Sequence, residues 1–161
     1  MLVTTARVLN LHNRKPNARI SHMPYEFNWY NSEHSIIRVD IVGEVSWEAF
    51  NILTDRVVDE LAIANHRIDL IYNDSVGMPE GNPMPYLKAS STRMSAHKSL
   101  GLIITVSPRS ISNFTKVMID ILMRAYQVDK SHNGGFVTTM DEALGIINKS
   151  RAKDHPVKQA N

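Results

Sequence analysis

The chain has 161 residues, of which 43% are hydrophobic and 21% charged, a composition typical of a soluble globular domain. It contains no cysteine, which excludes disulfides, thiolate metal ligands and a cysteine nucleophile. No apolar run approaches the roughly 18 residues that a membrane-spanning helix needs, and the amino end lacks the apolar core of a secretory signal. We therefore expect a cytoplasmic protein.

The net charge of +2 is unevenly distributed along the chain. Residues 1–22 carry four basic side chains and no acidic one, and the last residues are also basic. The charge pattern predicts a basic extension at 1–22, one domain at 23–150 and a basic tail at 151–161. Such ends are usually solvated, and no dense basic run gives a specific signal for nucleic acid.

The first elements form an expected antiparallel hairpin. Aromatic side chains alternate with polar ones from Tyr25 to Tyr30, and aliphatic side chains alternate with charged ones from Ile37 to Ile41. The aromatic strand could be a sheet edge that pairs with a second copy, so a homodimer is one expectation. Ser46 then reads as the N-cap of an amphipathic helix. Its apolar stripe consists of Trp47, Phe50, Leu53, Val57 and Leu61.

The rest of the chain alternates strands with helices. The expected elements are a strand at 68–72, a helix from about 85 to 97, a strand at 100–106, a helix from about 110 to 126, a strand at 136–138 and a last helix opened by a capping box at 139–142. This order predicts an α/β fold with a mixed sheet and helices as crossovers.

Two short segments within that order carry a family resemblance. They are IVGEV at residues 41–45 and FVTTMDEAL at residues 136–144. With the element order, they resemble the STAS domain, the fold of bacterial anti-sigma-factor antagonists, over roughly residues 24–150. The resemblance implies a four- to five-stranded sheet with about four helices mainly on one face. It also implies a regulatory protein that binds a partner protein and is switched by serine phosphorylation, whereas some relatives bind nucleotides or lipids.

The phosphoacceptor of the family lies in an Asp-Ser-x-Gly pattern at the start of the second helix, and residues 74–77 fit those letters. A phosphate on Ser75 would add nearly two negative charges to a partner surface. Here a proline-rich loop separates the motif from the next helix. The other interpretation is a β-turn, because Asp, Ser and Gly favour turns for local backbone reasons.

The loops at 74–84 and 107–112 are expected to follow neighbouring parallel strands, whose carboxyl ends form the usual ligand crevice of open α/β sheets. Arg109, beside a helix N-terminus, would suit an anion, or it is a solvated turn residue. The candidate crevice residues are Asp74, Ser75, Gly77, Met78, Asn82, Arg109 and Ser110.

Three function classes stay open. A regulatory protein-binding module comes first. A carrier of a small molecule, nucleotide or lipid comes second, with a pocket between sheet and helices lined by Met78, Met84, Tyr86 and Met94. An enzyme using His66, Asp74 or Arg109 comes third, because the sequence has no metal-binding histidine spacing and no phosphate-loop, dinucleotide or nucleophile-elbow motif. No cofactor is expected.

Overall fold

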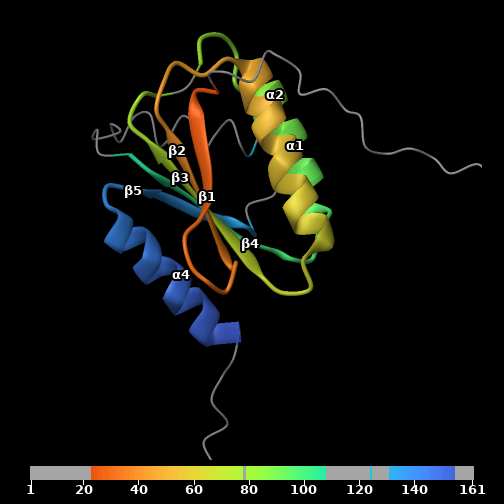
Figure 1. The fold of residues 1–161 in the computed structure, drawn as a ribbon, viewed down its shortest axis with the longest axis vertical. Coiled ribbons are helices and arrows are strands. Elements are labelled where there is room, and N and C mark those ends of the chain that lie inside the picture. The colour runs from red at the N-terminus through yellow and green to blue at the C-terminus, as the bar shows by residue number, and fades with distance from the viewer. Residues whose placement is uncertain (1–22, 78, 108–123, 125–130, 155–161) are drawn as a thin grey trace, which may run out of the picture.

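Five strands form one mixed sheet in the computed structural model, which describes residues 23–77, 79–107, 124 and 131–154 (Figure 1). The strands are β1 (Tyr25–Trp29), β2 (Ile36–Ile41), β3 (Ile68–Asp74), β4 (Leu100–Val106) and β5 (Asn133–Val137), and they lie in the sheet in this order. β1 runs antiparallel to β2, and β2 to β5 are parallel to one another. The predicted α/β fold with a mixed sheet is therefore confirmed.

The described residues contain three helices, α1 (Trp47–Ile63), α2 (Met84–Ser95) and α4 (Met140–Asp154). The helix expected at about 110 to 126 lies outside the described residues, apart from Arg124. The predicted domain ends at residue 150, whereas α4 continues to Asp154. The first four residues of the expected basic tail are therefore helical. The basic extension at 1–22 lies outside the described residues.

The helix starts follow the capping chemistry that the sequence predicts. The Ser46 hydroxyl accepts from the Ala49 amide at 3.1 Å and begins α1. The Thr139 hydroxyl accepts from the Glu142 amide at 3.2 Å, and the Glu142 carboxylate accepts from the Thr139 amide at 3.3 Å. This reciprocal pair is the predicted capping box at the start of α4.

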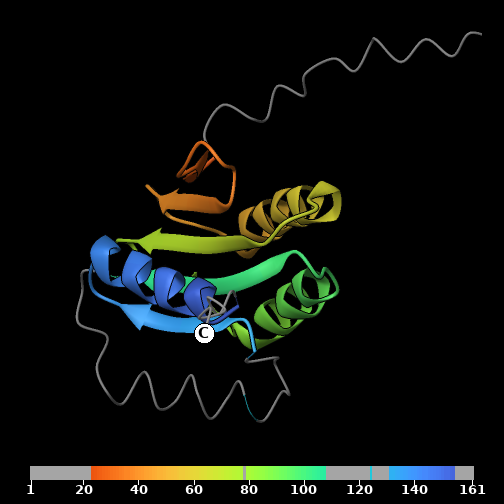
Figure 2. The same ribbon diagram turned by 90° about the horizontal axis from the view of Figure 1, so that it is seen from below.

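The described helices lie on both faces of the sheet, two on one face and one on the other. α1 and α2 cover one face, and α4 covers the other over β3, β4 and β5 (Figure 2). Each right-handed crossover from β2 to β3 and from β3 to β4 steps in the same direction through the sheet, so α1 and α2 lie on the same side. α4 follows β5 and leads to no further strand among the described residues, so the crossover rule does not fix its side.

The core has two layers, one on each face of the sheet. Ile37, Val39, Leu53, Val57 and Leu70 represent the larger layer beneath α1 and α2. The smaller layer lies beneath α4 and consists of Ile36, Ile71, Ile104, Val106, Ala143 and Ile147. α4 therefore covers an apolar face that would otherwise contact water.

Candidate functional site

The loop after β3 is held in one conformation by the side chain of Asp74. Its Oδ1 accepts from the amide of Val76 at 3.0 Å and from the amide of Gly77 at 2.7 Å. Gly77 has a φ of +109°, a conformation that glycine adopts without steric cost. Asp74 therefore acts as a turn residue, and one oxygen of its carboxylate is already occupied by two backbone donors.

The far end of the same loop is anchored to α1 and α2. The Trp47 indole donates from Nε1 to the Glu80 carbonyl at 2.7 Å, and its ring stacks on Tyr86 with centroids 4.6 Å apart. Asn82 Oδ1 accepts from the amide of Met84, the first residue of α2, at 3.1 Å. The loop is thus fixed at its two ends before any partner binds.

Ser75 lies exposed between the two anchors. Its hydroxyl donates weakly to the Ile41 carbonyl at 3.3 Å, which places it beside the end of β2. Val42 follows Ile41 and is 59% exposed, and Val76 follows Ser75 and is 41% exposed. We call Val42, Ser75 and Val76 the Ser75 surface, an accessible hydroxyl with an exposed valine on either side.

The structure brings together the described candidates of this crevice. Asp74 ends β3, and Ser75, Gly77 and Asn82 lie in the loop between β3 and α2, at the carboxyl end of the parallel strands (Figure 1). Met78, Arg109 and Ser110 lie outside the described residues. Asp74 and Asn82 accept from nearby backbone amides, whereas the exposed Ser75 hydroxyl makes a long hydrogen bond to the Ile41 carbonyl.

The side chains expected to line a carrier pocket are packed in other ways. Met84 and Met94 are buried core residues, and Tyr86 is stacked on Trp47.

The Tyr72 hydroxyl, on the α1 and α2 face of β3, is buried without a hydrogen-bond partner. Burial raises the pKa of this phenol above its usual value of 10.0.

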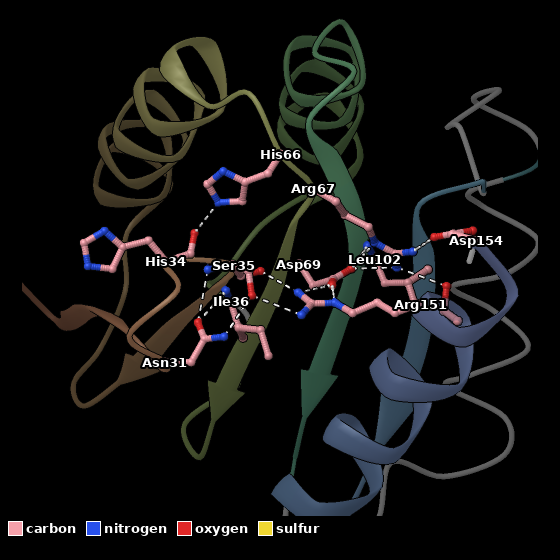
Figure 3. Close-up of polar contacts among 11 residues, drawn as sticks. Asn31, His34, Ser35, Ile36, His66, Arg67, Asp69, Leu102, Arg151 and Asp154 are labelled. Atoms are coloured by element: carbon pink, nitrogen blue, oxygen red, sulfur yellow. Dashed lines mark hydrogen bonds and ion pairs between the residues drawn. The ribbon is translucent and has the colours of Figure 1, made fainter. Parts of the chain in front are cut away.

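A second polar cluster, which the sequence reasoning missed, surrounds Asp69 at the opposite end of β3 (Figure 3). Asp69 is fully buried, and Arg67 donates to its Oδ1 from Nε at 3.0 Å and from Nη2 at 2.8 Å. The Leu102 amide donates to the same oxygen at 2.6 Å. Arg151 of α4 donates to Oδ2 from Nε at 2.8 Å, and its Nη2 forms an ion pair with the same oxygen at 2.7 Å.

The two arginines extend this cluster into α4 and the β1–β2 turn. Arg67 also pairs with Asp154 and donates to the Ser150 hydroxyl at 3.0 Å. Arg151 donates to the Ser35 hydroxyl at 3.0 Å and to the Ser35 carbonyl at 2.7 Å. Both oxygens of Asp69 are therefore saturated by protein donors, and the cluster fastens the last turn of α4 to the sheet rather than offering a free ligand.

A signal for this cluster was present in the sequence. Asp69 is the only charged residue in the otherwise apolar run of residues 68–72. A carboxylate in a buried strand requires a cation and further donors. The sequence does not show which cation, because Arg151 lies 82 positions away along the chain.

No family model, curated protein or solved structure matches this chain. The resemblance to the STAS domain therefore stays a prediction.

The part of the chain that the structure describes contains no group of three or more His, Asp or Glu side chains arranged to bind a metal ion. His66, a candidate acid or base, is exposed and its Nε2 contacts the His34 carbonyl at 2.9 Å. Asp74 and His66 lie at opposite ends of β3, since Asp74 ends the strand and His66 precedes it. The described residues of the enzyme hypothesis are thus not brought together.

Two further features bear on binding and on membranes. A shallow depression lies between β5 and α4, with Val137, Glu142, Ile146 and Lys149 among its lining residues. Within the described ranges, no helix combines the length and apolar character needed to cross a bilayer.

Proposed function

We propose that this protein is a regulatory binding module of the STAS type, which docks a partner protein on the Ser75 surface and releases it when Ser75 is phosphorylated. One observation carries the proposal: Ser75 is an accessible hydroxyl between two exposed valines, on a loop that hydrogen bonds anchor at both ends. Exposed apolar side chains around a polar group are typical of protein-binding sites.

The fixed loop favours binding because less conformational entropy is lost when a partner docks. Asp74 holds the backbone on one side of Ser75, and Trp47 holds the loop at Glu80 on the other. A partner that covers Val42 and Val76 gains the burial of both side chains without ordering the loop.

The same geometry supports phosphorylation as the switch. A phosphate on Ser75 would add about 1.5 to 2 negative charges within an apolar contact, where the cost of desolvating them opposes docking. The motif letters at 74–77 fit the family pattern. The modified protein is therefore the released form in this proposal.

The test begins with the identity of the partner. A photoreactive amino acid at position 76, in cells of the source organism, should crosslink a partner protein that the same group at position 32 does not. Ser32 is a matched control, because it is exposed and lies in the β1–β2 turn at the other end of the sheet.

Binding of the purified partner then tests the switch. We expect Ser75→Asp to weaken binding about tenfold or more, with Ser75→Ala and Ser32→Asp binding as the wild type does. Equal crosslinking at positions 76 and 32, or unchanged binding by Ser75→Asp, would overturn the proposal.

A carrier function is the second candidate, and Tyr72 is the observation that favours it. A buried hydroxyl without a partner costs free energy that a ligand bearing an acceptor would recover. Nucleotides and fatty acids should then raise the melting temperature of the wild type and not that of Tyr72→Phe. No shift with any of these compounds would remove this candidate.

A further inference from the structure

The outer edge of β1 offers an unpaired strand. β1 lies at one end of the sheet, and among the described residues only β2 pairs with it (Figure 2). The strand contains no lysine, proline or bulge, the devices that usually protect an edge from pairing. Its aromatic residues favour strand pairing.

The hydrogen-bond pattern identifies which groups point outward. The Val42 amide donates to the Pro24 carbonyl at 2.9 Å, and the Tyr30 amide donates to the Ile36 carbonyl at 2.8 Å. In an antiparallel strand, one residue directs both its N–H and its C=O group to the strand on one side, and the next residue directs both groups to the other side. The even-numbered residues of β1 therefore bond to β2, and Tyr25, Phe27 and Trp29 direct their N–H and C=O groups to the open edge.

The strand is complementary to itself in one antiparallel register. If Phe27 lies opposite Phe27 of a second copy, then Tyr25 lies opposite Trp29, and every outward N–H and C=O of the three aromatic residues finds a partner. Glu26 then lies opposite Asn28 in a pair whose side chains are close, and no like charges meet. A shift of the register leaves some of these outward groups unpaired.

Helix α1 presents apolar side chains on the same side. The Arg56 guanidinium lies 4.0 Å from the centroid of the Phe27 ring, so this side of α1 faces β1. Ile52 and Ile63 lie four residues before and seven after Arg56, on the same side of the helix, and are 46% and 82% exposed. A twofold axis through the Phe27 pair would bring the two α1 helices onto the same face, with these isoleucines directed toward each other.

We infer that the protein forms a twofold symmetric dimer by antiparallel pairing of β1 with β1 of a second copy, which joins the two sheets into one continuous sheet. The second copy is the occupant that the self-complementary register and the exposed isoleucines favour. The surface is separate from the Ser75 surface, because Ser75 does not lie on the open edge of β1.

Charge variants at position 28 test the register in the full-length chain by sedimentation equilibrium. The wild type should form a concentration-dependent dimer of twice 18.2 kDa. Asn28→Glu should raise the dissociation constant about tenfold, because each new carboxylate faces Glu26 of the other copy. Within its own chain the same carboxylate faces Arg38, so the fold itself should not be weakened.

Two further variants complete the test. Asn28→Lys, the control at the same position, should dimerise at least as tightly as the wild type, because the ammonium faces Glu26 of the other copy. Within its own chain the ammonium faces Arg38, whose charge Asp40 already pairs. The double variant Glu26→Lys with Asn28→Glu should restore the dimer that Asn28→Glu weakens. Ser75→Asp should leave the dissociation constant unchanged, which separates this inference from the proposed function.

Two results would overturn the inference. A wild type that remains monomeric at about millimolar concentration, where even weak association is detected, would mean that another segment or a partner peptide covers the edge. A dimer that responds equally to Asn28→Glu and Asn28→Lys would mean that a different surface joins the two copies.

Discussion

At the residue scale, Asp69 is the side chain on which the attachment of α4 most depends. It is fully buried and accepts hydrogen bonds from Arg67, which directly precedes β3, and from Arg151 of α4. Asp69→Asn should lower the free energy of unfolding by about 3–5 kcal/mol, because two arginines lose their buried counter-charge. Urea denaturation measures the change. Asp55→Asn, which breaks an exposed ion pair with Arg93, is the control and should cost less than about 1 kcal/mol.

Gly101 is required by the same cluster. A Cβ at position 101 would overlap the Asp69 carboxylate and the Arg67 guanidinium. Gly101→Ala should therefore destabilise the protein by about 1–3 kcal/mol through forced shifts in a packed site. Gly145→Ala in α4, where nothing lies within 4 Å of the new Cβ, should instead stabilise it by up to about 1 kcal/mol. Equal melting temperatures for the two variants would contradict the packing described for Asp69.

Substitution of Tyr72 is expected to stabilise the protein, in contrast to substitution of Asp69 or Gly101. Its hydroxyl is buried without a partner, so Tyr72→Phe should raise the free energy of unfolding by about 1 kcal/mol. A destabilised Tyr72→Phe protein would show that the hydroxyl has a partner in solution.

The pH dependence of stability checks the same residue. The folded pKa of Tyr72 lies above the unfolded value of 10.0, so the unfolded state binds fewer protons above that pH. Stability is unaffected by this group below pH 10.0 and falls as the pH rises further. Thermal unfolding at rising pH should show a smaller loss for Tyr72→Phe than for the wild type.

At the scale of elements, Trp47 connects α1 to the loop that carries Ser75. Trp47→Phe removes the donor to the Glu80 carbonyl and should speed amide hydrogen exchange in residues 80–82 about fivefold, the effect of one hydrogen bond of about 1 kcal/mol. Trp29→Phe changes the chain's other tryptophan, which stacks on His34 at the other end of the sheet. This control should leave exchange in the loop unchanged, and an equal effect of both variants would contradict the role given to Trp47.

The same scale shows what the sequence could predict. α1 and the start of α4 follow from local signals, because Ser46 and the pair Thr139–Glu142 cap amides three residues away. The strands follow from alternation and apolar runs. The side of the sheet that α4 occupies could not be predicted, since it depends on contacts with strands far along the chain.

The candidate site was predictable in part for the same reason. The turn at Asp74 is local, and both the turn interpretation and the exposure of Ser75 are consistent with residues 74–77 alone. The anchor from Trp47 to Glu80 and the bond from Ser75 to Ile41 join residues more than thirty positions apart. Only the assembled sheet places Val42 beside Ser75.

At the scale of the whole molecule, the two ends of the parallel strands differ in their side-chain contacts. The end where the strands begin contains the saturated cluster around Asp69, which fastens α4. The end where they finish contains the Ser75 surface, whose hydroxyl and valines remain accessible. This division places stability at one end and, in our proposal, recognition and its switch at the other.

Intact and peptide mass spectrometry of the protein isolated from its own cells tests the central claim most directly. We expect a fraction of the chains to carry one phosphate, located on Ser75 and absent from a Ser75→Ala variant expressed in the same cells. Ser32, which is also exposed and lies at the other end of the sheet, should remain unmodified. An unmodified Ser75 in cells where the partner is bound and released, or a phosphate that persists in Ser75→Ala, would contradict the account.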